Sequence, residues 1–375
     1  MRVAIDIGRV RDFGTGTYTR NLVTTLARLD PDTTYILVGT LADLAELGPL
    51  PENFSLLQSD RSRRSLRKDL QLSWKLRRQK VQLLHSPYLA VPWVVPCRHV
   101  VTVHDTAEFL DRRADGISLA ELLHFERTRY ALRRACRILS VSQATRRQLQ
   151  RLFAVPGEKI EVVYNALDTR LEQAPTPEEV ERTLSRYSAH SPYLLYAGNV
   201  KPHKNLPRLV EAFALLKDQL RQHPRYADLK LIIIGDELSK HAQLRHAVLK
   251  SRTQHDVRFL GFVAPQTLSV FYARASAFVF PSLHEGFGLP PLEAMALGTP
   301  VVASKAAALP EVLGDAAVFV NPEKVFDISR GIHRVLLDDD LRQRLIARGH
   351  QQVRRFSWDE SVRRVLEIYR LAALA

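Results

Sequence analysis

Two glutamates, Glu285 and Glu293, lie eight residues apart in the segment HEGFGLPPLE. The segment follows an apolar run of strand length, 277–280, and Glu293 falls one turn into the helix predicted next. Each ionised carboxylate can accept hydrogen bonds from two hydroxyl groups. Two carboxylates directed at one site favour a ligand rich in hydroxyl groups. The alternative is that the two glutamates are unrelated acids on the protein surface.

The backbone between these glutamates predicts a second kind of contact. Gly286 and Gly288 free the chain before the helix, and Pro290 suits a first helical turn because its missing N–H needs no partner there. The N–H groups of Phe287, Gly288 and Leu289 then remain available to hydroxyl or phosphate oxygens at the helix N-terminus. We expect these residues to hold an oxygen-rich ligand.

A cationic loop, GNVKPHKN, follows the apolar run 193–196. Gly198 permits a tight turn, and Lys204 stands at the start of the next predicted helix. A cation there opposes the helix dipole unless an anion lies between them. With Lys201 and His203 nearby, the spacing favours a phosphate site; a solvated loop is the alternative.

Two further loops follow predicted strands in the N-terminal half. The loop GTGTY opens a helix, and its glycines, Gly14 and Gly16, allow the backbone to approach a ligand closely. Its spacing is not a full GxGxxG, so an ordinary glycine turn is the alternative. The segment HDTAEF places His104 at the carboxyl end of the run 99–103, where α/β proteins bind ligands. An equally plausible interpretation is that this histidine and the aspartate after it have only a structural role.

Strands and helices must alternate along the chain to position these loops. The strand-length runs are rich in Val, Ile and Leu and do not alternate strictly with polar residues, which is typical of parallel strands buried on both faces. The predicted strands are 2–7, 35–38, 83–85, 99–103, 137–141, 160–163, 193–196, 230–234, 257–260, 277–280, 300–303 and 317–320. This order predicts an α/β protein with two Rossmann-like domains facing a central crevice.

The predicted domain boundaries follow from a proline- and glutamate-containing stretch at 168–191. We expect an N-terminal domain at 1–187 and a C-terminal domain at 188–356. The tail from residue 357 has apolar residues at helical spacing. We expect it to form a terminal helix, 357–375, that crosses back to the N-terminal domain.

Composition excludes several classes of protein. The chain has 375 residues, of which 46% are hydrophobic and 25% charged, so disorder, collagen and coiled coil do not describe it. Its two cysteines form no CxxC, which argues against a disulfide scaffold or a cysteine zinc site. The N-terminus has no apolar h-region, so we expect no secretory signal, and no apolar run reaches the roughly 20 residues that span a bilayer. We expect a cytoplasmic protein.

The chain is basic, with 54 Lys and Arg against 40 Asp and Glu, a formal charge of +14. Segment 61–80 carries nine of these cations and one acid, Asp69, so its net charge is nine minus one, +8. A solvated basic helix and a contact with an anionic membrane surface are both open. No aromatic platform or known module supports binding to nucleic acid, which we do not expect.

Together the four loops resemble those of the family 4, or group 1, retaining glycosyltransferases of GT-B fold. EGFGLPPLE resembles the E-x7-E motif of that family, and GNVKPHKN resembles its diphosphate loop. The resemblance includes VRFLGFV and GTGTY and covers nearly the whole chain. The PHKN form resembles the bacterial polysaccharide branch, with its mannosyl- and rhamnosyltransferases.

The resemblance implies that a sugar moves from a nucleotide diphosphate donor, held mainly by the C-terminal domain, to an acceptor held mainly by the N-terminal domain. Glu293 would bind the ribose hydroxyls, and Lys204 would neutralise the leaving diphosphate. Glu285 and the backbone of 287–289 would hold the donor sugar, and His104 would contact it near the reacting carbon. The catalytic set implied is therefore His104, Lys204 and Glu285.

The donor site implied by the resemblance is larger than the catalytic set. Gly16 would approach the diphosphate, and Phe262 and Val263 would flank the base. Asn199 departs from the family pattern, because many members have an arginine there that pairs with the lysine. The donor-binding residues implied are Gly14, Gly16, Gly198, Asn199, His203, Phe262, Val263, Gly286, Phe287, Gly288, Leu289 and Glu293.

The resemblance further implies no cofactor and no bound metal, the nucleotide sugar being a substrate. GDP-mannose is the expected donor, and a lipid-linked or oligosaccharide acceptor in cell-surface polysaccharide synthesis is expected, with the protein peripheral on the inner face of the membrane. A nucleotide-sugar epimerase of the same fold is the main alternative. A phosphorylase would need a pyridoxal phosphate lysine and a longer chain, and only the charge suggests a basic nucleic-acid-binding protein.

Overall fold

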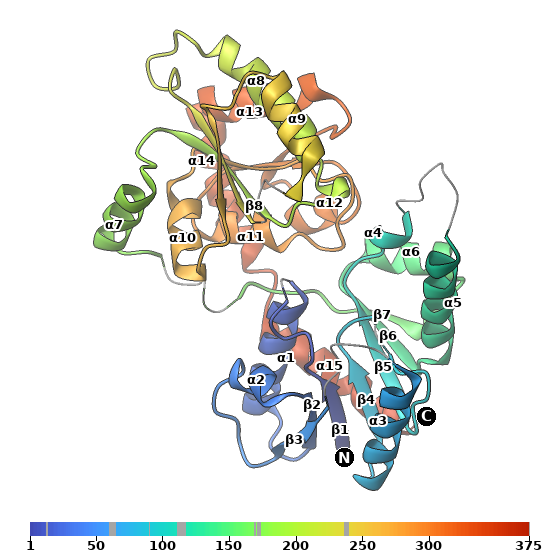
Figure 1. The fold of residues 1–375 in the computed structure, drawn as a ribbon. Helices are drawn as coiled ribbons and strands as arrows, with labels where there is room; N and C mark the ends of the chain where they lie inside the picture. Colours follow the sequence, from blue (N-terminus) through green and yellow to red (C-terminus); the bar gives the residue numbers. More distant parts are fainter. Residues whose placement is uncertain are drawn as a thin grey trace. The chain divides into compact units, whose positions relative to one another are not determined.

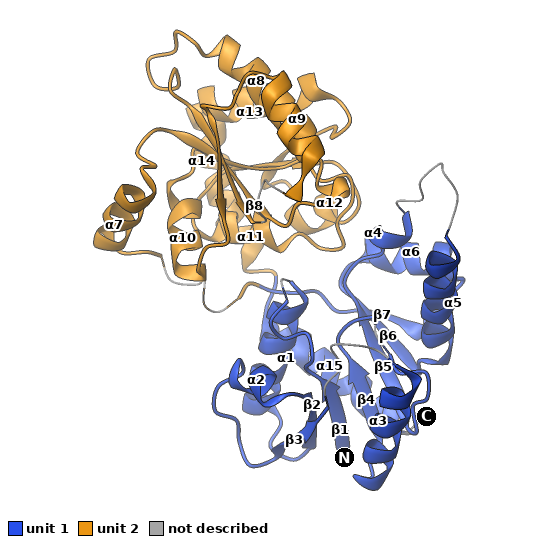
Figure 2. Cartoon of the chain, viewed as in Figure 1, with its two compact units in different colours: residues 1–166, 356–375 blue, residues 167–355 orange. Residues whose placement is uncertain are grey.

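The structure is a computed structural model that describes residues 1–12, 14–59, 65–89, 91–110, 118–168, 170, 174–235 and 240–374 (Figure 1). The chain forms two compact units (Figure 2). The first contains Met1–Ala166 and Phe356–Ala375, and the second contains Leu167–Arg355. Each unit is built on one parallel sheet, which confirms the predicted pair of Rossmann-like domains.

The first unit has a seven-stranded parallel sheet in the order β3-β2-β1-β4-β5-β6-β7. Its strands are β1 (Arg2–Asp6), β2 (Thr34–Gly39), β3 (Phe54–Gln58), β4 (Leu83–Ser86), β5 (Arg98–Val103), β6 (Arg137–Ser140) and β7 (Ile160–Val162). The strand order reverses between β1 and β4, which are neighbours in the sheet. Ligands of such sheets bind at the carboxyl ends of the strands beside this reversal.

The helices of the first unit include one from the end of the chain. They are α1 (Thr15–Leu29), α2 (Leu41–Ala45), α3 (Leu66–Arg78), α4 (Ala107–Leu110), α5 (Leu119–Arg134), α6 (Gln143–Phe153) and α15 (Trp358–Leu374), with a 3-10 turn, η1 (Gly157–Lys159). Helix α15 packs against α1, β4 and β5. Its residues Val362, Val365 and Tyr369 are fully buried in the same core as Leu22 and Val100.

A buried chain of hydrogen bonds ties α15 to the sheet. The Tyr18 hydroxyl and the Thr102 hydroxyl are 3.0 Å apart, and His85 Nε2 is 2.8 Å from the same Thr102 oxygen. His85 Nδ1 is 2.5 Å from the Tyr369 hydroxyl. Burial lowers the pKa of His85 to about 3, so the imidazole is neutral and has one donor and one acceptor nitrogen.

The second unit has a six-stranded parallel sheet in the order β10-β9-β8-β11-β12-β13. Its strands are β8 (Tyr193–Gly198), β9 (Lys230–Gly235), β10 (Val257–Gly261), β11 (Ala277–Phe280), β12 (Val301–Ser304) and β13 (Ala317–Val320). Numbered within the unit, this is the Rossmann order 3-2-1-4-5-6. The reversal lies between β8 and β11, which pair directly.

Helices pack around this second sheet in two groups. They are α7 (Pro177–Tyr187), α8 (Leu206–Gln219), α9 (Ala242–Lys250), α10 (Pro265–Arg274), α11 (Leu289–Ala296), α12 (Leu309–Leu313), α13 (Val325–Leu337) and α14 (Asp339–Val353), with a 3-10 turn, η3 (Pro202–Lys204). Helix α8 packs against α9 and α13, whereas α11 packs against α10 and α14. Throughout the described part of the chain, every helix is too short or too polar to cross a bilayer.

Candidate functional site

The second unit brings two of the predicted site residues into direct contact. Lys204 lies in the loop after β8, and Glu285 lies in the loop after β11. Because β8 and β11 are neighbours at the reversal of strand order, their carboxyl-end loops meet. The Lys204 Nζ donates to Glu285 Oε1 at 2.5 Å, and the side chains are only 14% and 11% exposed.

Contacts around this ion pair hold the two loops together. The Leu283 backbone N–H donates to the His203 carbonyl at 2.7 Å, which joins the loops one residue away from Lys204. The Lys204 ammonium also lies 5.5 Å from the centre of the Phe280 ring at the end of β11. Glu285 and the Phe280 ring therefore both hold the Lys204 ammonium in place. An anionic ligand would compete with Glu285 for this ammonium group.

Helix α11 begins after Gly288, an N-cap residue that has no side chain to cap it. Gly288 has φ +102°, a conformation that favours glycine, and it makes no side-chain cap. Pro290 and Pro291 contribute no N–H to the first turn. The Leu289 N–H remains there, at the positive end of the helix dipole and four residues after Glu285.

Helix α8 starts in a similarly unusual way. Asn205 is left-handed, with φ +63°, and its side-chain amide does not cap the helix. Instead its Nδ2 donates to the carbonyls of Pro281 and Pro322, at 3.1 Å and 2.7 Å. The first turn carries no acid, and Lys204 and Arg208 both lie at this end. Two cations at a helix N-terminus favour an anionic ligand there.

Glu293 lies one turn into α11, as predicted, and is held by a residue that the sequence did not indicate. The Tyr272 hydroxyl of α10 donates to Glu293 Oε2 at 2.8 Å. The pKa of Glu293 is raised to about 7, chiefly by burial and also by the Asp168 charge, while the Tyr272 hydrogen bond and Arg170 oppose the rise. The carboxyl group can therefore change its charge near neutral pH.

Asn199 follows Gly198 at the end of β8. Its Oδ1 is buried and has no hydrogen-bond partner among the described residues. Its backbone carbonyl accepts from the Tyr196 hydroxyl at 3.0 Å, so the backbone position is fixed while the amide oxygen is left for a ligand. A buried acceptor without a partner is costly in a folded protein.

Phe262 and Val263 follow β10, which is separated from β8 by β9 alone. At about 4.8 Å between neighbouring strands, the ends of β8 and β10 lie roughly 10 Å apart. The Phe262 ring is 69% exposed, whereas Val263 is buried. An exposed ring at this edge can stack on a flat heterocycle, and Val263 contributes to the core instead.

The first unit presents its predicted residues at the carboxyl ends of β1 and β5. A Cβ on Gly16 would lie 2.2 Å from the Val10 carbonyl oxygen, so the loop after β1 requires glycine there. Gly14 precedes α1 with φ +64° and open space around it. Both glycines are thus explained by the backbone alone.

His104 follows β5 and is oriented by a backbone carbonyl. Its Nε2–H donates to the Pro87 carbonyl at 2.8 Å, and its ring meets the Tyr18 ring edge-on at 4.8 Å. Burial lowers the pKa of His104, while the Pro87 carbonyl opposes that change. The neutral imidazole keeps its proton on Nε2, so Nδ1 can accept a hydrogen bond from a hydroxyl group.

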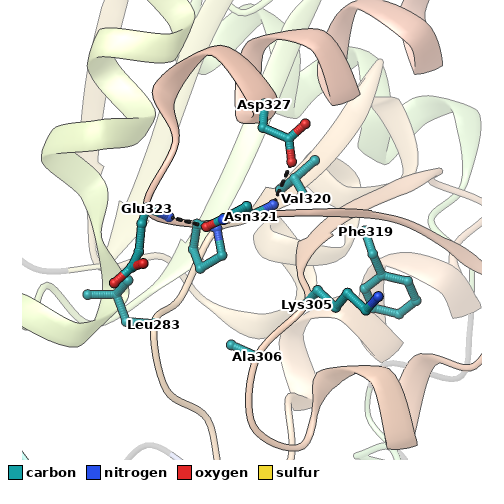
Figure 3. Close-up of a pocket in the computed structure, with 9 residues that line it drawn as sticks. Leu283, Lys305, Ala306, Phe319, Val320, Asn321, Glu323 and Asp327 are labelled. Carbon is teal, nitrogen blue, oxygen red and sulfur yellow. Dashed lines mark hydrogen bonds between the residues drawn. The ribbon is translucent and has the colours of Figure 1, made fainter.

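A pocket of about 530 Å³ lies at the carboxyl ends of β12 and β13 in the second unit (Figure 3). The residues that line it include Leu283, which is two residues before Glu285, together with Lys305 and Asp327. The Asp327 carboxylate accepts from the Asn321 N–H at 2.7 Å, and that bond lowers its pKa. The residues predicted for the site do not line this pocket.

Comparison with known proteins gives two family matches that together span most of the chain. Residues 14–171 match the model described as Glycosyltransferase Family 4, and residues 181–352 match Glycosyl transferases group 1. A relative, O-antigen chain mannosyltransferase B of Escherichia coli, is 35% identical over 308 residues, which cover 80% of this chain and 77% of the relative.

Two further similarities concern a longer relative and a solved structure. The serotype-specific mannosyltransferase WbdA of Escherichia coli is 29% identical over 282 residues, or 74% of this chain; the match spans only 33% of that longer protein. The crystal structure of Anabaena Alr3699/HepE in complex with UDP and glucose superposes with a TM-score of 0.76 at 17% identity. The superposition covers 98% of this chain and 99% of the other, which shows that the two proteins share a fold.

Proposed function

Because the chain belongs to the group 1 glycosyltransferases of family 4, we propose that it transfers mannose from GDP-mannose with retention of the anomeric configuration. The acceptor we propose is a saccharide or lipid-linked saccharide of cell-surface polysaccharide synthesis. The names of the relatives, an O-antigen chain mannosyltransferase among them, support the sugar and the setting. GDP is the nucleotide that we expect to carry the mannose.

The observation that carries this proposal is the contact between Lys204 and Glu285 at the β8–β11 reversal, beside two uncapped helix N-termini. A departing nucleoside diphosphate gains negative charge as the sugar–oxygen bond breaks. A lysine and preorganised N–H groups stabilise that charge in the transition state. Glu285, released from Lys204 when the diphosphate arrives, becomes an acceptor for hydroxyl groups of the sugar.

Glu293 is proposed to hold the ribose. An ionised carboxylate accepts two hydroxyl hydrogen bonds, and a ribose presents two adjacent hydroxyls. Since burial raises the pKa of Glu293 to about 7, ribose binding favours loss of its proton. Tyr272 orients the carboxylate through its 2.8 Å hydrogen bond and acts as a positioning residue. Phe262 is proposed to stack on the base.

Retention is proposed to follow from attack on the face that the diphosphate leaves. The acceptor hydroxyl forms the new bond to the anomeric carbon, the bond to the diphosphate oxygen breaks, and that oxygen takes the hydroxyl proton. A double displacement would instead need a free carboxylate nucleophile. Glu285, once the diphosphate has displaced it from Lys204, is assigned to the hydroxyl groups of the donor sugar, which favours the direct route.

His104 is proposed to contact the donor sugar. Its Nε2 is committed to the Pro87 carbonyl, so Nδ1 is the nitrogen that accepts from a sugar hydroxyl. The lowered pKa of His104 keeps the ring neutral at pH 7, as this acceptor role requires. We also propose that no metal ion is needed, since Lys204 and the helix N-termini offset the diphosphate charge.

The test combines binding and turnover of the full chain. Thermal unfolding with GDP, UDP, dTDP and ADP should show stabilisation by GDP alone, about 2.7 kcal/mol at 100 times the dissociation constant. Incubation with GDP-α-mannose and a mannose-terminated acceptor, with and without EDTA, should yield an α-linked product, identified by proton NMR. A β-linked product would refute retention, and stabilisation by UDP alone would refute the donor.

A further inference from the structure

Exposed apolar side chains gather in one part of the first unit. Of the 17 large hydrophobic residues that are exposed among those described, ten lie between residues 66 and 130. They belong to α3, to the segment 91–95 and to the stretch that ends in α5. Scattered exposed leucines are ordinary, but a cluster of this kind marks an interaction surface.

Helix α3 contributes a continuous apolar stripe. Leu66, Leu70 and Trp74 are spaced four residues apart, so they lie on one side of the helix. Their side chains are 60%, 50% and 60% exposed. The opposite side of α3, through Leu72 and Leu76, is packed into the core. The stripe is therefore not needed to hold the helix on the sheet.

The stripe continues onto the segment 91–95. Asp69, which neighbours the stripe on α3, accepts from the Trp93 backbone N–H at 3.0 Å and from the Arg127 guanidinium at 3.3 Å. The Ser73 hydroxyl bonds to the Val94 carbonyl. Trp93 is 46% exposed, and its backbone N–H is bonded to Asp69, the residue before Leu70 in α3.

Helix α5 extends the same surface. The Trp93 ring lies 6.3 Å from the Tyr130 ring of α5, and the Arg127 guanidinium lies 4.9 Å from the Trp93 ring. Leu119 and Leu123 share a face of α5 with Tyr130, and they are 72% and 61% exposed. Leucine, tryptophan and tyrosine thus cover one connected area on two helices and the segment between them.

This area is strongly basic. Helix α3 carries five Lys or Arg and one Asp, and α5 carries four Arg and two Glu, so the net charge of the two helices is nine minus three, +6. The Arg78 guanidinium lies 5.4 Å from the Trp74 ring. Arg61, Arg63 and Arg64, which the sequence analysis grouped with these cations, lie outside the described residues.

We propose that this surface, formed by Leu70, Trp74, Trp93, Leu123 and Tyr130 with the surrounding cations, docks on an anionic lipid bilayer. Exposed leucines enter the acyl boundary, tryptophan and tyrosine occupy the interface, and Lys and Arg pair with anionic headgroups. Two copies docked face to face would place +6 against +6, which disfavours a dimer. Single-stranded nucleic acid uses aromatic platforms in a basic groove, and it gives the exposed leucines no partner.

The experiment measures sedimentation of the full chain with vesicles of phosphatidylcholine alone or with 30% phosphatidylglycerol, at low and high salt. Binding should require the anionic lipid and fall with salt. Arg77→Gln with Arg78→Gln should weaken it roughly thirtyfold, about fivefold per cation. Leu70→Ser with Trp74→Ser should weaken it about tenfold or more.

Matched controls come from the second unit. Arg182→Gln with Lys250→Gln removes the same charge, and Phe326→Ser removes a ring that is 75% exposed; both should bind within twofold of wild type. Each of these variants should still transfer the sugar to a water-soluble acceptor. Loss of vesicle binding can therefore be distinguished from loss of the proposed transferase activity. Unaltered thermal unfolding of each variant shows that it is folded.

Three results would overturn the proposal. The first is a Leu70→Ser/Trp74→Ser variant that sediments with anionic vesicles as wild type does, because the apolar stripe would then have no part in binding. The second is a lipid-free dimer that this variant dissociates in analytical ultracentrifugation. The third is tight, salt-dependent binding of random single-stranded DNA by wild-type protein that does not sediment with the vesicles.

Discussion

Replacing Glu293 with glutamine should change the pH dependence of folding stability in a direction fixed by the structure. Burial raises the pKa of Glu293 to about 7 from an ordinary value of 4.5. A carboxyl group with a raised pKa contributes stability that is complete below the unfolded-state value and lost as pH rises through the folded-state value. Wild type should therefore lose stability between pH 4.5 and 7, and Glu293→Gln should not.

The magnitude follows from the size of that rise. One pKa unit is worth about 1.4 kcal/mol, so the ionised carboxylate costs the folded state at most about 3.5 kcal/mol above pH 7. In a unit of this size each kcal/mol moves the melting temperature by roughly 2–4 °C. Glu293→Gln should thus melt roughly 7–14 °C above wild type at pH 8 and within a few degrees of it at pH 4.5. The Tyr272 hydroxyl can still donate to the glutamine carbonyl.

The assay is thermal unfolding of ligand-free wild type and Glu293→Gln between pH 4.5 and 8.5. The transition of the second unit is the one to follow, because the two units need not unfold together. Glu178→Gln, which removes an exposed carboxylate from the same unit, is the matched control and should run parallel to wild type. In the same variant we expect GDP binding to weaken at pH 8, since glutamine accepts fewer ribose hydroxyls.

A difference between Glu293→Gln and wild type that stays constant with pH would refute the reasoning, because the carboxyl group would then titrate alike in the folded and unfolded chain. A difference that grows toward low pH would contradict its sign. If the stability changes with pH as expected but GDP binding is unaltered, the raised pKa of Glu293 is supported and its contact with the ribose is refuted.

Three further predictions concern the remaining site residues. Lys204→Met should lower kcat at least about a hundredfold and destabilise the fold by leaving Glu285 unpaired; adding Glu285→Gln should restore the melting temperature and leave the rate low. Asn199→Ala should leave stability equal or higher, because it removes an unsatisfied buried acceptor, yet raise the KM for the donor; an unchanged KM would exclude a contact. Gly16→Ala should unfold the first unit or cost several kcal/mol, whereas Gly14→Ala, strained but unobstructed, should cost about 1–2 kcal/mol by denaturant unfolding.

The strands of both sheets could be predicted where they are buried on both faces. Strand β3 (Phe54–Gln58) was not predicted, and its position explains why. It lies at the edge of the first sheet, paired only with β2, and its residues are half-buried or exposed. A five-residue segment with Ser55 and Gln58 among its apolar residues lacks the continuous hydrophobic run that a central parallel strand shows.

The candidate site was predictable in its parts but not in its contacts. The sequence placed Lys204 and Glu285 after separate strands, but their 2.5 Å contact depends on β8 and β11 being neighbours, which no local pattern encodes. Tyr272 was missed because it lies 21 residues before Glu293 on a different helix. Its only sequence signal is a tyrosine at a buried position of an apolar helix, which ordinarily means packing.

The origin of α15 at the end of the chain has a consequence for synthesis on the ribosome. The second unit is one continuous stretch, so all of its contacts can close once residue 355 has emerged. The core of the first unit receives Trp358, Val362 and Tyr369 only afterwards. The unit that is translated first is therefore completed last, and until then its apolar surface beside α1 lies open to chaperones.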